Sequence, residues 1–186
     1  MRNPNSSLRG KLVGFGNRTQ VGKKSAARGT FFVELSFAAN VRAKAEFIDS
    51  YVSDFGLRLT DAAERLGPDG EKLEVDEVRR LIQELGGKSE ELIGSKVWIQ
   101  PTIEMSRILR RDGSSVAIPD VRFPDEADAI KSAGGKVIRI DRPDIPRLDH
   151  PTECALDDYD FDHVIDNSGT VEELCAAVRA IVGHGS

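Results

Sequence analysis

The chain has 186 residues, 39% of them hydrophobic, which is enough for one sizeable core and short for two, so we expect a single domain over residues 1–186. A net charge of -5, from 31 acidic and 26 basic residues, argues against binding to a nucleic acid polymer but leaves room for a small anion held by a few cations. Residues 1–10 carry basic groups without an apolar run behind them and no stretch approaches a bilayer span, so we expect a flexible N-terminal tail and a cytoplasmic protein that binds no membrane.

The first third of the chain predicts alternating strands and helices. Residues 11–15 form a short apolar run that stops at a glycine, typical of a strand, and residues 23–28 follow as the start of a helix. The run 30–37 is rich in Phe and Val and predicts a strand buried on both faces. Apolar residues then recur at helical spacing, which predicts a helix over residues 40–55 ended by Gly56.

The middle third contains the most regular amphipathic pattern. The turn cluster at residues 67–70 predicts a loop over residues 57–73. Residues 74–85 alternate apolar and charged side chains at helical spacing and predict a surface helix. Residues 96–99 favour an extended segment, followed by a helix at residues 103–109.

The last third predicts a βαβ unit and a final helix. We expect strands at residues 115–119, 136–140 and 163–166 and a helix at residues 124–133. Thr170 opens the last helix, and Glu173 three residues later completes a capping box. Strands that alternate with helices imply an α/β fold with a mostly parallel central sheet, covered by helices on both faces.

The loop after the first strand has the parts of a phosphate cradle. Gly22, Lys23 and Ser25 supply a permissive backbone, a lysine for the β and γ oxygens and a hydroxyl for Mg²⁺. The strict pattern G-x-x-x-x-G-K-[ST] wants glycine at Asn17 and a hydroxyl at Lys24, and asparagine tolerates the left-handed conformation that glycine would adopt. The alternative is an ordinary polar turn before a helix.

A carboxylate and a guanidinium follow the strand at residues 115–119. If the chain stays extended, period-two alternation turns Asp120 and Arg122 to the same side. The carboxylate is suited to Mg²⁺ and the guanidinium to a phosphate, and phosphoryl transfer asks for little more than such positioning and charge neutralisation. The alternative is a surface ion pair, which is common and energetically minor.

Arginines also follow the strand at residues 136–140. Arg142 and Arg147 lie in a proline-punctuated stretch, residues 142–158, which we interpret as a lid-like loop that adds positive charge over a bound nucleotide. A solvated charged loop is the alternative.

Several segments resemble the phage-type deoxynucleoside monophosphate kinases, and the similarity covers residues 78–182. The segments that carry it are IPDVRFPDEADAI at 118–130, GGKVIRI at 134–140, HPTE at 150–153 and DNSGT at 166–170. The resemblance implies a P-loop kinase-like three-layer sandwich that uses ATP and Mg²⁺ to phosphorylate a deoxynucleoside monophosphate to the diphosphate.

The resemblance also implies roles for individual residues. ATP would be bound by Gly16, Asn17, Gly22, Lys23, Lys24, Ser25, Asn167 and Gly169. Catalysis would depend on Lys23, Asp120, Arg122 and Arg142, with Ser25 and Asp120 as the candidate ligands of Mg²⁺. The acceptor nucleotide would be held by Ser36, Phe37, Trp98, Arg122, Glu126 and Glu153.

The phosphate loop departs from that family's usual pattern. Asn17, Lys24 and Ser25 stand where the family usually has Gly, Asp and Thr, and only residues 24–29 separate the loop from the next strand. A helix that short is a poor phosphate dipole. Two alternatives therefore stay open, a catalytically degenerate protein that binds a nucleotide or a protein partner, and a kinase of another small phosphorylated acceptor. A homodimer is compatible with all three.

Overall fold

The computed structural model describes residues 10–17, 20–48, 51–52, 57–58, 84, 91, 94–145 and 154–183. Contacts divide the chain into two compact units. The sheet unit comprises Met1–Phe37 and Pro101–Ser186, and the second unit comprises Ala38–Gln100.

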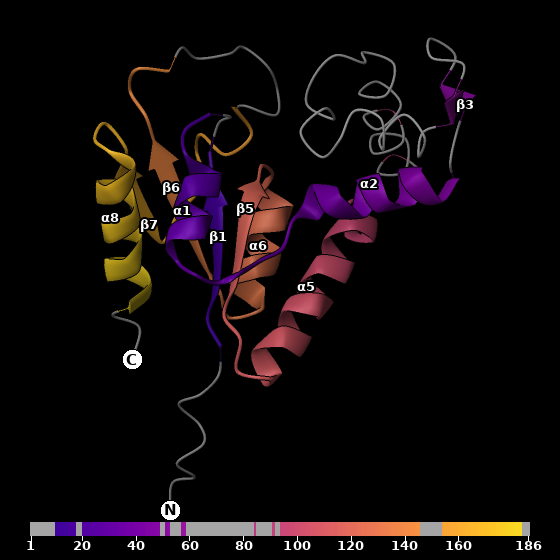
Figure 1. Ribbon diagram of the computed structural model, residues 1–186, viewed down its shortest axis with the longest axis horizontal. Helices are drawn as coiled ribbons and strands as arrows, with labels where there is room; N and C mark the ends of the chain where they lie inside the picture. Colours follow the sequence, from indigo (N-terminus) through magenta and orange to yellow (C-terminus); the bar gives the residue numbers. More distant parts are fainter. Residues whose placement is uncertain are drawn as a thin grey trace, which may run out of the picture. The chain divides into compact units, whose positions relative to one another are not determined.

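A five-stranded, all-parallel sheet organises the sheet unit (Figure 1). Its spatial order is β2-β5-β1-β6-β7. The strands are β1 Leu12–Gly16, β2 Val33–Glu34, β5 Val116–Val121, β6 Lys136–Asp141 and β7 His163–Asp166. From β1 the chain first builds one side of the sheet, through β2 and β5, and then crosses to β6 on the other side. The order therefore reverses around β1, and ligands of such sheets bind at the carboxyl ends of the strands at that point.

Helices α1 and α8 cover one face of the sheet and pack against each other. The helices that contribute to the sheet unit are α1 Lys23–Gly29, α6 Pro124–Ser132, α8 Val171–Gly183 and, from Pro101 onward, α5 Lys96–Arg111. Alternate strand residues such as Val13, Phe15 and Ile138 are fully buried in one cluster with Leu174 and Val178 of α8. Each such side chain contributes about 1.5–3 kcal/mol by leaving water.

Helix α6 covers the opposite face. It packs against β1 and β6, and Ile130 is its fully buried anchor. A Cβ added at Gly14 would lie 2.6 Å from Ile130 Cδ1, so β1 can approach α6 this closely only with glycine there. Because Gly14 alternates with Val13 and Phe15 along β1, the two faces are separate and the unit has three layers.

A capping box fixes the start of α8. Thr170 Oγ1 accepts a hydrogen bond from Glu173 N at 3.2 Å, and Glu173 Oε2 accepts one from Thr170 N at 2.8 Å. This confirms the predicted start of the last helix. Among the described residues, no helix is both long and apolar enough to cross a bilayer.

The second unit holds most of helix α2 Phe37–Ile48, an antiparallel pair of two-residue strands and the first residues of α5. The strands are β3 Tyr51–Val52 and β4 Leu57–Arg58. Inside this unit, Asn40 Nδ2 donates to the Trp98 carbonyl oxygen at 3.0 Å, which ties α2 to the start of α5.

Three elements predicted between residues 30 and 73 differ from the structure. The helix predicted for residues 40–55 ends at Ile48, and residues 51–52 form β3. The loop predicted for residues 57–73 begins with β4. The strand predicted for residues 30–37 shrinks to β2, an exposed edge strand, because Phe31 adopts a positive φ of 59° that breaks an extended run.

The extended segment predicted for residues 96–99 is wrong, because these residues are the first turn of α5. Their β-branched and aromatic residues suggested a strand, yet the buried positions 98, 99, 102, 103 and 106 follow helical spacing. The helix predicted for residues 74–85 lies outside the described residues, apart from the helical Glu84. The strands and helices predicted for the last third are confirmed within one or two residues.

Candidate nucleotide site at the carboxyl ends of the strands

A cavity of about 290 Å³ opens at the carboxyl ends of β1, β6 and β7, on the switch point of the sheet. It is lined by Asn17, Val21, Asp141, Arg142, Pro143, Ile145, Val164 and Asp166. Apolar side chains, two carboxylates, one amide and one guanidinium thus line the same cavity, as is typical of a small-molecule site.

The loop between β1 and α1 has the backbone of a phosphate cradle. Asn17, Gln20 and Gly22 adopt φ values of 105°, 64° and 99°. Asn17 thus has the positive φ that asparagine tolerates at the glycine position of the strict pattern. At Gly22 no other residue fits, since an added Cβ would also lie 2.6 Å from Asn167 Nδ2.

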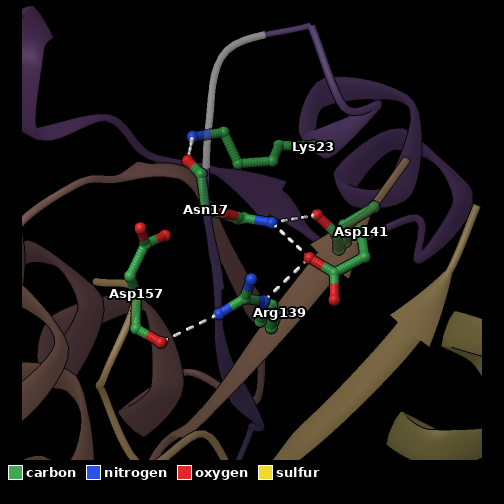
Figure 2. A network of polar contacts seen from close by, with 6 residues as sticks. Asn17, Lys23, Arg139, Asp141 and Asp157 are labelled. Atoms are coloured by element: carbon green, nitrogen blue, oxygen red, sulfur yellow. Dashed lines mark hydrogen bonds and ion pairs between the residues drawn. The ribbon is translucent and has the colours of Figure 1, made fainter. Parts of the chain in front are cut away.

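Lys23 begins α1 and lies almost completely buried over this loop. Its Nζ donates to the Asn17 carbonyl oxygen at 2.5 Å, as Figure 2 shows. A lysine at this position places a positive charge beside the loop that an anion would enter.

Asn17 is itself held by the end of β6. Its Nδ2 donates to the Ile140 carbonyl oxygen at 2.8 Å and to Asp141 Oδ1 at 2.6 Å. The same carboxylate oxygen accepts Arg139 Nε at 2.8 Å, and Arg139 Nη1 reaches the Asp157 carbonyl oxygen at 3.2 Å (Figure 2). The candidate residues predicted from the sequence did not include Arg139 and Asp141. The signal that could have found them is their spacing of two at the end of a strand, which turns both side chains to one side.

Asn167 supports the loop from the side of β7. Its buried Nδ2 donates to the Val21 carbonyl oxygen at 2.9 Å. Gly169 is exposed two residues further on, where an added Cβ would lie 2.2 Å from Glu173 Oε2 of the capping box. Both residues therefore lie beside the start of α8, and Asn167 contacts the backbone next to Gly22.

Asp120, at the end of β5, contacts two of the predicted acceptor residues. Its Oδ2 accepts Ser36 Oγ at 2.7 Å and its Oδ1 accepts Phe37 N at 3.2 Å. A carboxylate at the first turn of α2 satisfies a helix N–H that would otherwise lack a partner. The structure thus brings Asp120, Ser36 and Phe37 together.

Arg122 and Glu126 lie where β5 passes into α6. The Arg122 guanidinium is exposed, and no ion pair joins it to a carboxylate in the described parts of the chain. Glu126 Oε2 accepts Arg122 N at 2.6 Å and Phe123 N at 3.0 Å, which satisfies two backbone donors at the start of α6. Burial, with smaller contributions from Asp120 and Asp125, raises the pKa of Glu126 to about 7, although the two N–H donors act in the opposite direction.

The other predicted residues are spread over the chain. Gly16 ends β1, Lys24 is exposed, Ser25 is half-buried in α1, and Arg142 is exposed at the rim of the cavity. Trp98 lies in the second unit. Glu153 and Arg147 lie outside the described residues. Within the residues that the structure describes, no group of three or more acidic, histidine or cysteine side chains could hold a metal by itself.

Comparison with known sequences points to one family. A family model described as "Deoxynucleotide monophosphate kinase" matches residues 41–178. A "Putative deoxynucleotide monophosphate kinase" of Acanthamoeba polyphaga mimivirus is 40% identical over 81 residues, 42% of this chain and 42% of that protein. The deoxynucleotide monophosphate kinase of Enterobacteria phage T4 is 40% identical over 63 residues, 33% of this chain and 26% of that protein. The match therefore spans less than half the length of either relative.

Solved structures share the fold. Dephospho-CoA kinase from Campylobacter jejuni is similar with a TM-score of 0.52 and 14% identity, over 94% of this chain and 97% of that chain. A Thermus thermophilus protein is similar with a TM-score of 0.52 and 16% identity, over 96% of this chain and 99% of that chain. These similarities confirm the predicted kinase-like α/β architecture.

Proposed function

Because the chain belongs to the deoxynucleotide monophosphate kinase family, we propose that it transfers the γ-phosphoryl group of ATP to a deoxynucleoside monophosphate, which gives the diphosphate. Membership confirms the resemblance found in the sequence and implies nucleotide binding. The use of ATP with Mg²⁺ and the identity of the acceptor belong to the proposal. So do a cytoplasmic location and any homodimer.

The observation that carries the proposal is the position of Lys23. Its buried ammonium group lies over a loop with three positive φ values, beside the cavity at the switch point of the sheet. Backbone N–H groups of such a loop converge on an anion, and the lysine supplies a positive charge next to them. On this proposal, Lys23 exchanges the Asn17 carbonyl oxygen for the β and γ oxygens of ATP.

The cavity suits the base and sugar of the donor. Pro143, Ile145 and Val164 offer apolar surface, and Asp141 and Asp166 offer carboxylate acceptors for amino or hydroxyl groups. In this arrangement Asn167 and Gly169 lie after β7. Asn167 donates to the Val21 carbonyl oxygen and so holds the phosphate loop instead of contacting the base. Gly16, Asn17 and Gly22 shape the loop, and Lys24, exposed at its edge, adds charge.

Three cations would act on the transferred group and the acceptor. Lys23 and Arg142 lie on the donor side, and Arg142 has no hydrogen bond or ion pair through its side chain to another described residue. Arg122, equally exposed, is placed to hold the phosphate of the acceptor in two parallel hydrogen bonds. Such charges lower the barrier because negative charge spreads over the phosphoryl oxygens in the transition state.

The residues around Asp120 fit Mg²⁺. The Asp120 carboxylate is the kind of oxygen ligand that Mg²⁺ prefers, and Ser36 Oγ and Phe37 N hold it at the end of β5. Ser25 contributes a half-buried hydroxyl, and Mg²⁺ in such sites needs only one or two protein ligands besides water and phosphate. Bound there, the ion would neutralise charge on the β and γ phosphates.

Acceptor binding is the least constrained part of the proposal. Ser36 and Phe37 are held at the end of β5, and Trp98 and Glu153 are retained as acceptor residues from the resemblance. Glu126 acts there through Arg122, because its carboxylate fixes the Arg122 backbone N–H.

A second function is favoured by one feature, the seven-residue length of α1. A helix this short adds little dipole to the phosphate site, which suits a protein that binds nucleotide without turnover. A kinase of another phosphorylated acceptor would use the same donor site.

Formation of ADP with each deoxynucleoside monophosphate in turn separates these functions. We expect turnover with at least one acceptor, and a fall in kcat/KM on the order of 10²–10³-fold in Lys23→Ala and in Arg122→Ala. Lys136→Ala and Arg111→Ala, which remove exposed cations elsewhere on the sheet unit, serve as matched controls and should retain the activity. ATP binding without ADP formation would favour the binding protein, and turnover with a non-nucleotide phosphate alone would favour the other kinase.

A further inference from the structure

Four residues form a continuous chain of hydrogen bonds that ends at Lys23, and the last bond uses the backbone carbonyl of Asn17. Arg139 Nε donates to Asp141 Oδ1 at 2.8 Å, and that oxygen also accepts Asn17 Nδ2 at 2.6 Å. The Asn17 carbonyl oxygen then accepts Lys23 Nζ at 2.5 Å. Figure 2 shows this relay running from β6 across the end of β1 to the first residue of α1.

The link through Asn17 exists because the residue is not glycine. The strict phosphate-loop pattern has glycine at this position, which allows a positive φ but has no side chain. Asn17 adopts a φ of 105° and in addition anchors the loop to Ile140 and Asp141. The substitution therefore keeps the backbone conformation and adds a tether.

The far end of the relay is fixed from several sides. Arg139 lies on β6 with its side chain about one-fifth exposed, and its Nη1 donates to the Asp157 carbonyl oxygen. Its guanidinium carbon lies 5.8 Å from the centre of the Phe161 ring. A charged hydrogen bond with a positioned donor is stronger than a neutral one, so Asp141 cannot turn away from Asn17 freely.

We propose that Arg139 and Asp141 are positioning residues that hold Lys23, through Asn17, in the place where it meets the phosphates of ATP. The inference rests on the proposed function. Helix α1, which follows the phosphate loop, has only seven residues. The hydrogen bonds from Asn17 to β6 hold the loop from the side opposite to α1, and so compensate for the short helix.

A double-mutant cycle on phosphate affinity tests the relay, with tripolyphosphate as the probe because it has no base to touch the cavity. Asn17→Gly keeps the positive φ accessible and removes only the amide, and Arg139→Met removes the guanidinium and keeps the apolar stem. We expect each variant to bind tripolyphosphate about 10-fold more weakly, and the double variant to be no weaker than about 10-fold. Arg139→Lys, which keeps a cation beside Asp141, should stay within about 3-fold of the unmodified protein.

A purely structural role for Arg139 predicts a different pattern. In that case Arg139→Met lowers the unfolding free energy. Its effect on tripolyphosphate affinity is then either absent or independent of Asn17→Gly, so that the double variant binds about 100-fold more weakly. Either result would overturn the relay. Should Arg139→Met fail to fold, Asp141→Ala removes the carboxylate oxygen that accepts both Arg139 Nε and Asn17 Nδ2. If the unmodified protein bound neither tripolyphosphate nor ATP, the proposed function would fail. If it bound both, lost them in Lys23→Ala and kept them in all relay variants, only the relay would fail.

Discussion

Basic side chains lie at both ends of the parallel strands but have different partners at the two ends. We call the side of the sheet where the strands begin the amino edge, and the side where they end the carboxyl edge. At the amino edge, Arg110 Nε donates to the Gly10 carbonyl oxygen at 2.8 Å and its Nη1 to the Ala133 carbonyl oxygen at 2.7 Å. Lys11 Nζ donates to the Val182 carbonyl oxygen near the end of α8. At the carboxyl edge, the guanidinium groups of Arg122 and Arg142 are exposed and bond to no other described side chain or carbonyl.

This difference shows how to distinguish cations that stabilise the fold from cations that bind ligands. The amino edge also has a cavity, of about 220 Å³, lined in part by Lys11, Arg110 and Lys136. Lys11 and Arg110, however, donate to carbonyl groups near the ends of α8 and α6, where positive charge stabilises the helix. At the carboxyl edge, the exposed guanidinium groups of Arg122 and Arg142 are accessible from solution, and the proposed function assigns them to phosphate groups.

The largest effect is expected from Gly22→Ala at the carboxyl edge. A left-handed φ costs a residue with a side chain about 1–2 kcal/mol, and the collision of the new Cβ with Asn167 Nδ2 at 2.6 Å adds about 1–3 kcal/mol. We expect a loss of roughly 3 kcal/mol in the unfolding free energy, measured by urea denaturation, together with a loss of ATP binding.

Gly113→Ala provides the matched control for the cost of the backbone alone. Gly113 has a φ of 87°, and an added Cβ there would meet nothing within 4 Å. The Gly113→Ala variant should lose about 1 kcal/mol of unfolding free energy and leave ATP binding intact. Equal losses in the two variants would show that the contact with Asn167 adds nothing.

Arginine removal at each edge separates stability from binding. Arg110→Met removes two charged hydrogen bonds and should lower the unfolding free energy by roughly 2 kcal/mol without changing the affinity for ATP. Arg142→Met should change stability by less than about 0.5 kcal/mol and weaken ATP binding about 10-fold. Calorimetry of ATP binding beside denaturant curves measures both quantities. The reverse pattern would refute the distinction between the edges.

Acid–base behaviour offers a further test at the carboxyl edge, through Glu126. Its folded pKa of about 7 lies above the usual 4.5, so the folded protein binds the proton more tightly than the unfolded chain. The stability is therefore complete below about pH 4.5 and falls as pH rises to about 7, by on the order of 2 kcal/mol. Urea denaturation across pH 4–8 measures the fall.

Two glutamine variants isolate this contribution. Glu126→Gln keeps a carbonyl acceptor for Arg122 N and Phe123 N and should remove the fall between pH 4.5 and 7. Glu173→Gln alters the corresponding position of the exposed capping box of α8 and should leave the fall in place. A fall that persists in Glu126→Gln would assign it to another group.

Local patterns were sufficient to predict much of this fold. Glycine stops and apolar runs located the strands of the last third, and the three-residue spacing from Thr170 to Glu173 located the start of α8. The phosphate loop was also visible, because Gly22 and Lys23 are neighbours in the sequence and their geometry is set within the loop.

Contacts between distant segments were not visible in the same way. The Arg139–Asp141–Asn17 relay joins residues more than 120 positions apart, and neither end has a local signature. The start of α5 was misread for a related reason, since Trp98 and Ile99 favour strands by propensity and only their burial with later positions of the helix shows the helical period. Burial also decides the pKa of Glu126, which the sequence assigned to acceptor binding without indicating a raised pKa.

The smallest effects are expected at the two ends of α8, which runs from the carboxyl edge to the amino edge. Thr170→Ala removes the cap at its start, and Lys11→Met removes the cation on the Val182 carbonyl oxygen near its end. Each should lower the unfolding free energy by about 1 kcal/mol. Each should also leave ATP affinity within about 2-fold, because the loop is held by Asn167, which precedes the cap. If Thr170→Ala alone weakened ATP binding 10-fold, the start of α8 would belong to the nucleotide site, and that part of the carboxyl edge would serve binding as well as stability.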